Sequence, residues 1–267
     1  MGWFDVHAHL THPRFTDVDR ALARARSAGV TTIISNGLNP DDNAAVAALA
    51  ARQPLVRPAF GFYPVDTVLP QMVAQGVDYP RDDTRLVTAE EGIAWVRDHA
   101  ASAFAIGEIG LDGHWVPPDL WPAQEAVFDA LVQVALDNDK PMICHSRKRE
   151  PRMLEMLSAK GAKRVNWHCF GGRLNLAKQI AEAGHWLSLP ANLHRSQSFM
   201  RIAEVLPRDR ILLETDCPFL SPEPGTPSEP AHVADTARTL ARLWGIGIDA
   251  VQTQLEDNFE ALFGVRP

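Results

Sequence analysis

The chain has 267 residues, 46% of them apolar, and a formal net charge of -7. This length suits one α/β barrel with a sizeable core, and the acidic balance argues against a protein that grips a long polyanion through bulk charge. The three cysteines form no CxxC pair, and no apolar run reaches the roughly 18 residues of a membrane span. We therefore expect a soluble cytoplasmic protein with no membrane contact.

Short apolar runs that end in polar residues recur along the chain and predict strands buried on both faces. They cover residues 3–7, 31–36, 56–62, 104–108, 141–145, 164–168, 185–189 and 210–214. Helical stretches between them cover residues 17–29, 41–52, 121–137, 174–183 and 199–206. The alternation predicts a parallel sheet with right-handed crossovers, closed into a (β/α)8 TIM barrel of the α/β class. We expect one domain over residues 1–267, with two closing helices within 231–263.

Two unusual loops should overhang the C-terminal face of this barrel, where such barrels place their chemistry. Residues 65–91 form a long stretch that is rich in Asp, Pro and Gly, and residues 221–230 contain four prolines. Both stretches follow predicted strand ends. We therefore expect both of them to border the active site.

Six side chains that can bind a metal stand at the ends of five predicted strands. They are His7, His9, Glu108, His145, His168 and Asp216. A spacing of two residues points His7 and His9 to the same side of their strand. Since the C-terminal ends of barrel strands converge on one mouth, all six groups should share one site. Four neutral imidazoles and two carboxylates suit a pair of divalent metals, with Glu108 able to bridge them.

Each of these residues also has an interpretation without a metal. A lone histidine is more often a hydrogen-bonded core residue, Glu108 could form a buried salt bridge, and Asp216 could cap the next helix. The combination of six such groups at strand ends favours the metal site. Asp5, one step deeper on the first strand, is a candidate to orient a histidine ligand. The three cysteines each adjoin a proposed ligand, so strand alternation should turn them toward the helix layer.

Other polar residues near the predicted strand ends are candidates to bind substrate. Arg147, two residues beyond His145, can reach a phosphate oxygen with its planar guanidinium, and a surface ion pair is an equally good interpretation. Glu229 is a second candidate, in the proline-rich loop. Trp115 could offer a stacking platform for a base.

The sequence resembles the TatD family of metal-dependent deoxyribonucleases, within the amidohydrolase superfamily. The resemblance is carried by Asp5-Val-His-Ala-His9, Gly107-Glu-Ile-Gly-Leu-Asp112, His145-Ser-Arg147, His168-Cys-Phe170, Leu213-Glu-Thr-Asp-Cys-Pro218 and Asn258-Phe-Glu-Ala-Leu-Phe263. It implies a TIM barrel with two divalent metals, which could be Zn, Mn, Mg, Co or Ni. It places His7, His9, Glu108 and Asp216 around one ion. Glu108, His145 and His168 then surround the other.

Three departures from the family pattern bear on the substrate. The family motif Gly-x-His-Pro reads Gly61-Phe-Tyr-Pro64 here. Tyr63, with an ordinary pKa of about 10, cannot carry a positive charge near neutrality but can donate a hydrogen bond. The loop segment 223–228 lacks the basic residues that the family often has, so gripping of a phosphate backbone should be weaker, and a protein partner could supply the missing basic surface. The acidic stretch 65–91 could act as a lid or as a partner surface.

The candidate ligands predict a metal-dependent hydrolase. The resemblance implies that it is a TatD-type DNase that cuts single-stranded or short DNA from the 3′ end. RNA is a further substrate to consider. The catalytic residues are Glu108, which bridges the metals, and Asp216, which takes a proton from the attacking water. One alternative keeps the two metals and hydrolyses an amide, ester or lactone. Another is a barrel without activity that serves as an interaction module.

Overall fold

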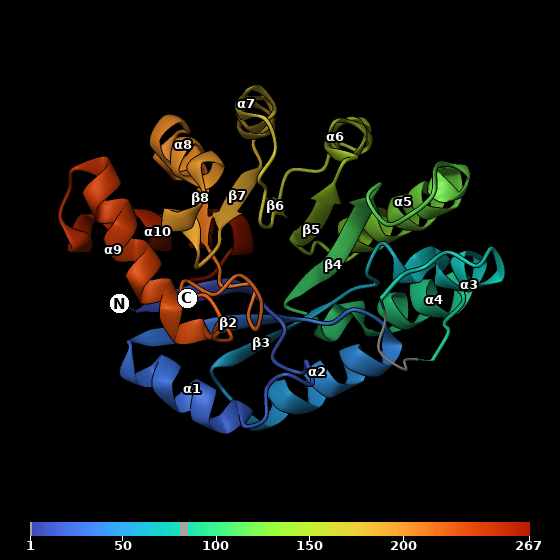
Figure 1. Ribbon diagram of the computed structural model, residues 1–267, viewed down its shortest axis with the longest axis horizontal. Coiled ribbons are helices and arrows are strands. Elements are labelled where there is room, and N and C mark those ends of the chain that lie inside the picture. Colours follow the sequence, from blue (N-terminus) through green and yellow to red (C-terminus); the bar gives the residue numbers. More distant parts are fainter. Residues whose placement is uncertain (1, 81–84) are drawn as a thin grey trace.

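The computed structural model describes residues 2–80 and 85–267 (Figure 1). Within these residues, eight strands form one sheet in the order β1 to β8, and every neighbouring pair is parallel. The strands are β1 (Trp3–Ala8), β2 (Val30–Asn36), β3 (Val56–Phe60), β4 (Ala105–Asp112), β5 (Met142–Arg147), β6 (Val165–Trp167), β7 (Trp186–Leu189) and β8 (Ile211–Leu213). A parallel bridge between Ala8 and Cys217 joins β1 to the segment after β8. The predicted (β/α)8 TIM barrel is therefore confirmed.

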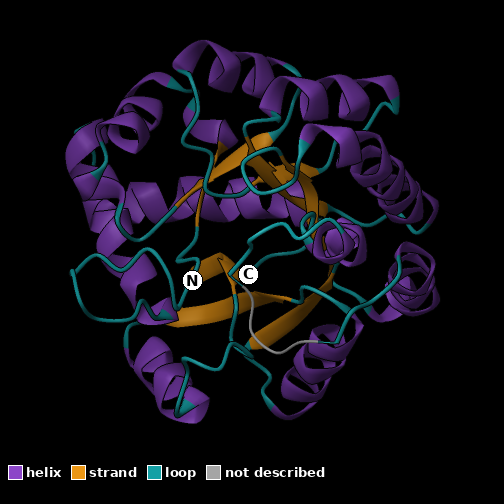
Figure 2. Ribbon diagram, turned by 45° about the vertical axis from the view of Figure 1, so that its right-hand side comes forward, coloured by secondary structure: helices purple, strands orange, loops and turns teal. Residues whose placement is uncertain are grey.

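Helices surround the strands on the outside (Figure 2). They are α1 (Val18–Ser27), α2 (Pro40–Arg52), α3 (Leu69–Ala74), α4 (Ala89–His99), α5 (Trp121–Asp137), α6 (Glu150–Ala159), α7 (Leu174–Glu182), α8 (Gln197–Val205), α9 (Val233–Trp244) and α10 (Ile248–Phe263). Side-chain caps start several of them, because the first N–H groups of a helix lack partners within it. Asp17, Asn39 and Thr88 accept such N–H groups at α1, α2 and α4. The two predicted closing helices are α9 and α10.

Strand β4 is longer than the prediction, which ended it at Glu108. Its last three residues pair with β5, where Gly110 lies opposite His145 and Asp112 opposite Arg147. Gly110 has φ 149°, and a Cβ on it would lie 2.0 Å from the carbonyl oxygen of His145. The glycine is what lets the two strands approach here. As a result, β4 carries Glu108 and Asp112 on one continuous strand at the barrel mouth.

The prediction of a loop over residues 65–91 is wrong for most of the described part. A 3-10 turn at Asp66–Val68 leads into α3, and α4 begins at Ala89. Local signals mark the start of both helices. Pro70 lies in the first turn of α3, and Thr88 caps α4 and is followed by acidic residues. Residues 81–84 of this stretch lie outside the described residues. Helix α6, which begins at Glu150 with a proline in its first turn, was also not predicted.

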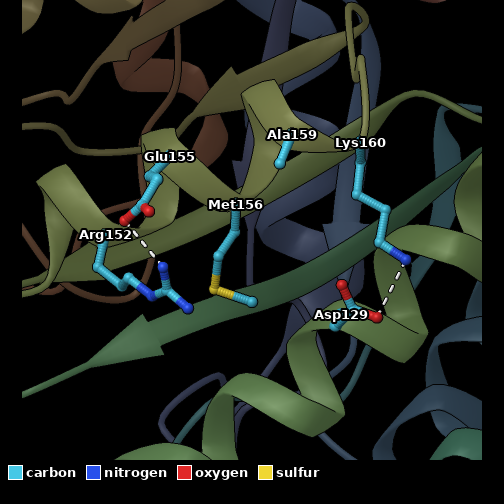
Figure 3. Close-up of a pocket in the computed structure, with 6 residues that line it drawn as sticks. All are labelled: Asp129, Arg152, Glu155, Met156, Ala159 and Lys160. Atoms are coloured by element: carbon cyan, nitrogen blue, oxygen red, sulfur yellow. Dashed lines mark ion pairs between the residues drawn. The ribbon is translucent and has the colours of Figure 1, made fainter.

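A groove between α5 and α6 lies in the outer helix layer. Two ion pairs line it, one between Arg152 and Glu155 and one between Lys160 and Asp129 (Figure 3). This groove is a helix-packing feature, since its charges satisfy one another. None of the helices in the described part of the chain is long and apolar enough to span a membrane.

Candidate metal centre

A first group of ligand atoms comes from β1, β4 and the segment after β8. The Nε2 atoms of His7 and His9 are 3.1 Å apart. Asp216 Oδ1 lies 3.5 and 3.4 Å from these two nitrogens, and Glu108 Oε2 lies 3.6 and 3.5 Å from them. Four tetrahedral ligands at the usual zinc distances would be about 3.3 Å apart. His7, His9 and Asp216 therefore have the mutual spacing of ligands around a single divalent ion, and Glu108 lies close to the two histidines of this group.

A second group uses the other oxygen of Glu108. Glu108 Oε1 lies 3.0 Å from His145 Nδ1 and 3.0 Å from His168 Nε2, and these two nitrogens are 3.5 Å apart. Three protein ligands leave room for a water or a substrate, as catalytic metal sites do. The two groups adjoin, because the His7 ring stacks on the His168 ring with centroids 3.8 Å apart. Glu108 is therefore placed to bridge two ions.

The ionisable groups of this centre strongly shift one another's pKa values, because all of them are buried or nearly buried. Burial alone would raise the pKa of Glu108, but His168 and His145 hold it well below its usual range. Burial would lower the pKa of His168, but Glu108 and Glu214 raise it well above its usual value. In the same way, hydrogen bonding to Asp216 and the Glu108 charge outweigh burial and raise the pKa of His9 to about 9. The carboxylates thus stabilise the protonated, positively charged forms of His9 and His168.

Metal binding should therefore release protons near neutral pH. An imidazole must be neutral to bind a metal, and His9 and His168, with raised pKa values, carry protons in the metal-free protein. Glu108 is already ionised and adds none. We expect the metal affinity to rise with pH up to about pH 9, where His9 loses its proton in the metal-free protein. Calorimetry in buffers of different ionisation enthalpy measures the released protons, and an affinity independent of pH would contradict this assignment.

A second layer of polar groups fixes the orientation of two imidazoles. His145 Nε2 lies 3.0 Å from Asp112 Oδ2, and His9 Nδ1 lies 3.2 Å from the carbonyl oxygen of Asn36. Glu214 Oε1 lies 3.7 Å from His168 Nδ1, beyond hydrogen-bond distance, and acts on that imidazole through its charge. Such partners set the ring nitrogen that faces the metal. Sequence reasoning missed both Asp112 and Glu214. The available signal was the even spacing from Glu108 to Asp112 and from Glu214 to Asp216, which is the spacing of side chains on one side of a strand.

Replacing Asp112 by asparagine tests this layer. The amide cannot hold the His145 Nε2–H with a negative charge, so we expect the second group to bind metal about 10- to 100-fold more weakly. Competition with a chelator of known affinity measures the change. Asp119→Asn is the matched control, because Asp119 is exposed in the following loop and binds Gln75. Equal metal affinities in the two variants would disprove the orienting role.

Asp5 acts on the backbone of the centre. Its Oδ1 accepts the backbone N–H of His7 at 3.2 Å and that of Thr215 at 3.0 Å, and its Oδ2 accepts the Thr215 hydroxyl. Burial raises the pKa of Asp5 to about 8, although these hydrogen bonds lower it. The carboxyl group thus ties the end of β1 to the segment before Asp216. It positions the ligand His7 through the backbone.

Backbone contacts complete the frame around the ligands. The backbone N–H of Asp216 donates to the carbonyl oxygen of His7 at 2.9 Å. A Cβ at Gly61 would lie 2.3 Å from the backbone N and O of Glu108, so the strand pair needs glycine there. Cys144 and Cys217 are part of the apolar core, and Cys169 packs against it. The cysteines thus pack as apolar groups.

Comparisons with known proteins place the chain in a family. The family model described as TatD related DNase matches residues 4–264. The chain belongs to the TatD family. The TatD homologue YjjV of Escherichia coli K12 is 27% identical, with a TM-score of 0.82 over 98% of each chain. An uncharacterised metal-dependent hydrolase, YabD of Bacillus subtilis, is 29% identical over 98% of this chain and 99% of its own. Human deoxyribonuclease TATDN3 is 29% identical over 98% of this chain and 95% of its own.

One of the three residues predicted to bind substrate contacts a residue of the candidate centre, and a second lies on the same strand as that residue. The Tyr63 ring lies 5.1 Å from the His145 ring, edge to face, and packs on an apolar cluster. That cluster consists of Val65, Val68, Met72, Val116 and Leu120. The segment 65–72 therefore holds Tyr63 beside the second ligand group. Arg147 is exposed at the end of β5.

Glu229 binds other residues of the protein, away from the candidate ligands. Its carboxylate forms an ion pair with Arg24 of α1 at 2.6 Å, and its backbone N–H donates to His232 Nδ1 at 3.2 Å within a capping box. These contacts give Glu229 a role in fixing the proline-rich loop to α1.

Trp121, at the start of α5, has a structural role. Its Nε1–H donates to the carbonyl oxygen of Val116, and the Arg149 guanidinium stacks on its ring at 4.0 Å.

Proposed function

We propose that this TatD-family hydrolase is a phosphodiesterase that uses two divalent metals and removes nucleotides from the 3′ end of single-stranded or short DNA in the cytoplasm. The observation that carries the proposal is the position of the Glu108 carboxylate, whose two oxygens lie in different ligand groups. Metals held about 3.5–4 Å apart suit the in-line displacement of phosphodiester hydrolysis, since they stabilise both the attacking and the leaving oxygen. The human relative named as a deoxyribonuclease supports DNA as the substrate.

The ligand set fits such metals, because imidazole nitrogens and carboxylate oxygens are the donors that Zn, Mn, Co and Ni accept. When bound, divalent metals supply an activated water near neutral pH and stabilise negative charge on phosphoryl oxygens. Asp216 is 14% exposed, against 0% for His7 and 2% for Glu108. It is therefore the carboxylate that reaches the open side of the centre, where it accepts the proton of the attacking water.

Two further residues hold the substrate phosphate. Burial and the nearby Glu108 charge raise the pKa of Tyr63 well above its usual value, so its phenol stays protonated and can donate to a phosphoryl oxygen. Arg147 lies at the end of β5, in the same strand as His145, and its exposed guanidinium can bind a phosphate oxygen of the neighbouring nucleotide. Both residues select an anionic substrate over a neutral one.

A hydrolase of amides, esters or lactones is the second candidate, because its chemistry needs the same metals. The net charge of -7 favours it, since an acidic surface repels a polyanion at long range. The two candidates differ in what they cut, so parallel assays on a nitrophenyl phosphodiester and on nitrophenyl esters separate them. Activity on the phosphodiester alone would remove this candidate.

The deciding experiment is hydrolysis of short single-stranded DNA that is labelled at its 5′ or its 3′ end. Mg, Mn or Zn is added to the purified protein, and an RNA of the same sequence is tested beside the DNA. We expect stepwise shortening from the 3′ end that EDTA abolishes. Absence of cleavage by protein that contains two metals per chain would overturn the proposal for the chain alone, and repeating the assay with a basic protein partner would test whether cleavage needs one.

A further inference from the structure

Phe219 lies at the rim of the metal centre, three residues beyond Asp216. Its backbone N–H donates to the carbonyl oxygen of Asp216 at 2.9 Å, and the N–H of Ser228 donates to the carbonyl oxygen of Pro218 at 3.0 Å. These two bonds fix the turn that carries the ring. The side chain is 37% exposed, and it is the one aromatic residue among the large apolar side chains that are exposed in the described part of the chain.

The ring of Phe219 is braced on one side by the loop between β1 and α1. It lies 6.2 Å from the ring of the ligand His9 and 5.1 Å from the ring of His12, both at steep angles. The Arg14 guanidinium lies 5.2 Å from its centroid. The loop itself is held by turns, since His12 N–H donates to the carbonyl oxygen of His9 at 3.1 Å and Arg14 N–H donates to His12 Nδ1 at 3.1 Å. The exposed part of the ring is therefore held in place beside a metal ligand.

Positive charge reaches this position from two other loops. Arg14 comes from the loop after β1, and Arg195, from the loop after β7, donates to the carbonyl oxygen of Ser221 at 3.3 Å. Within residues 2–80 and 85–267, neither guanidinium forms an ion pair with a carboxylate. The segment 219–221 has no basic residue of its own, but a cation lies on each side of it. Uncompensated guanidinium groups attract the phosphates of a nucleic acid strand.

We propose that Phe219 is the stacking platform for one nucleobase next to the scissile phosphodiester, and that Arg14 binds a phosphate of the same strand. This rests on the proposed nuclease function and names the part of the site that selects its substrate. A base can stack on a ring only when it is free of its complement, and stacking accepts any base because every base has an aromatic face. The platform thus makes the enzyme selective for single strands without sequence preference.

The test compares two oligonucleotides of equal length and charge. One is ordinary single-stranded DNA, and in the other every nucleoside is replaced by an abasic tetrahydrofuran residue. We expect Phe219→Ala to lower kcat/KM for the ordinary strand by about 5- to 100-fold, which is the range for the loss of one base stack. The rate on the abasic strand should not change. Phe219→Trp should restore the preference for bases, and Arg14→Gln should raise KM for both strands.

Leu136→Ala is the matched control, because Leu136 is a similarly exposed apolar residue at the C-terminal end of α5, far along the chain from the ligands. It should behave as the wild type on both strands. If Phe219→Ala cuts ordinary DNA as fast as the wild type, or loses the same factor on both strands, the platform is disproved while the nuclease stands. If the wild type cuts neither strand with metal bound, the proposed function itself fails, and the platform with it.

Discussion

Replacing Glu108 by glutamine is expected to slow DNA hydrolysis by at least about a thousandfold, which exceeds the roughly 10- to 100-fold loss that follows removal of an outer-shell partner. Glutamine keeps one carbonyl oxygen, but its amide nitrogen cannot bind a metal, so one of the two ligand groups loses a member. It also removes a negative charge that favours cations at both ligand groups and raises the pKa values of His9 and His168. We therefore expect the metal content to fall below about two ions per chain, measured by elemental analysis after dialysis.

The matched control for this substitution is Glu125→Gln. Glu108 is fully buried and Glu125 is partly buried, but Glu125 binds Arg149 and Arg152 at α6, in the helix layer. This variant should keep both its metals and its rate. Full metal-dependent hydrolysis by the Glu108→Gln protein would show that Glu108 is not a bridge, and the assignment of both ligand groups would then be wrong.

The strands could be predicted from the sequence because both of their faces are buried. Such strands read as apolar runs, and the polar residue that ends each run marks the barrel mouth. The helices α3, α4 and α6 were missed because their signals are local caps and first-turn prolines that lie inside polar, proline-containing stretches. The prediction treated residues 65–91 as a loop because their composition is typical of one.

The ligand residues of the candidate centre could be named from the sequence, but their partners could not. Asp112 meets His145 across the β4–β5 pair, and Glu214 reaches His168 from the end of β8. Such contacts depend on strand register, which a sequence does not display. The basic groups near the centre could not be predicted either. Residues 223–228 of the proline-rich loop contain no basic residue, but Arg14 contacts Phe219 and Arg195 contacts Ser221, each from a separate loop.

Asp216→Asn is expected to separate catalysis from metal binding. Asparagine keeps an oxygen at the position of Oδ1, next to His7 and His9, so the first group should still hold a metal, more weakly than before. It cannot accept a proton, so kcat should fall by about 10²- to 10⁴-fold, the usual contribution of a general base. KM should change little, because Tyr63 and Arg147, the proposed phosphate contacts, are unchanged.

Two measurements distinguish this outcome from simple loss of the metal. Elemental analysis of the Asp216→Asn protein at saturating metal should find about as many ions as in the wild type, whereas Glu108→Gln should lack one. Raising the pH should speed the variant, because hydroxide from solution can replace the missing base. Asp209→Asn, which alters an exposed residue just before β8, is the matched control. A variant that lost its metal and its activity together would make Asp216 a ligand only, and the proton would then have to go to another group at the mouth of the barrel.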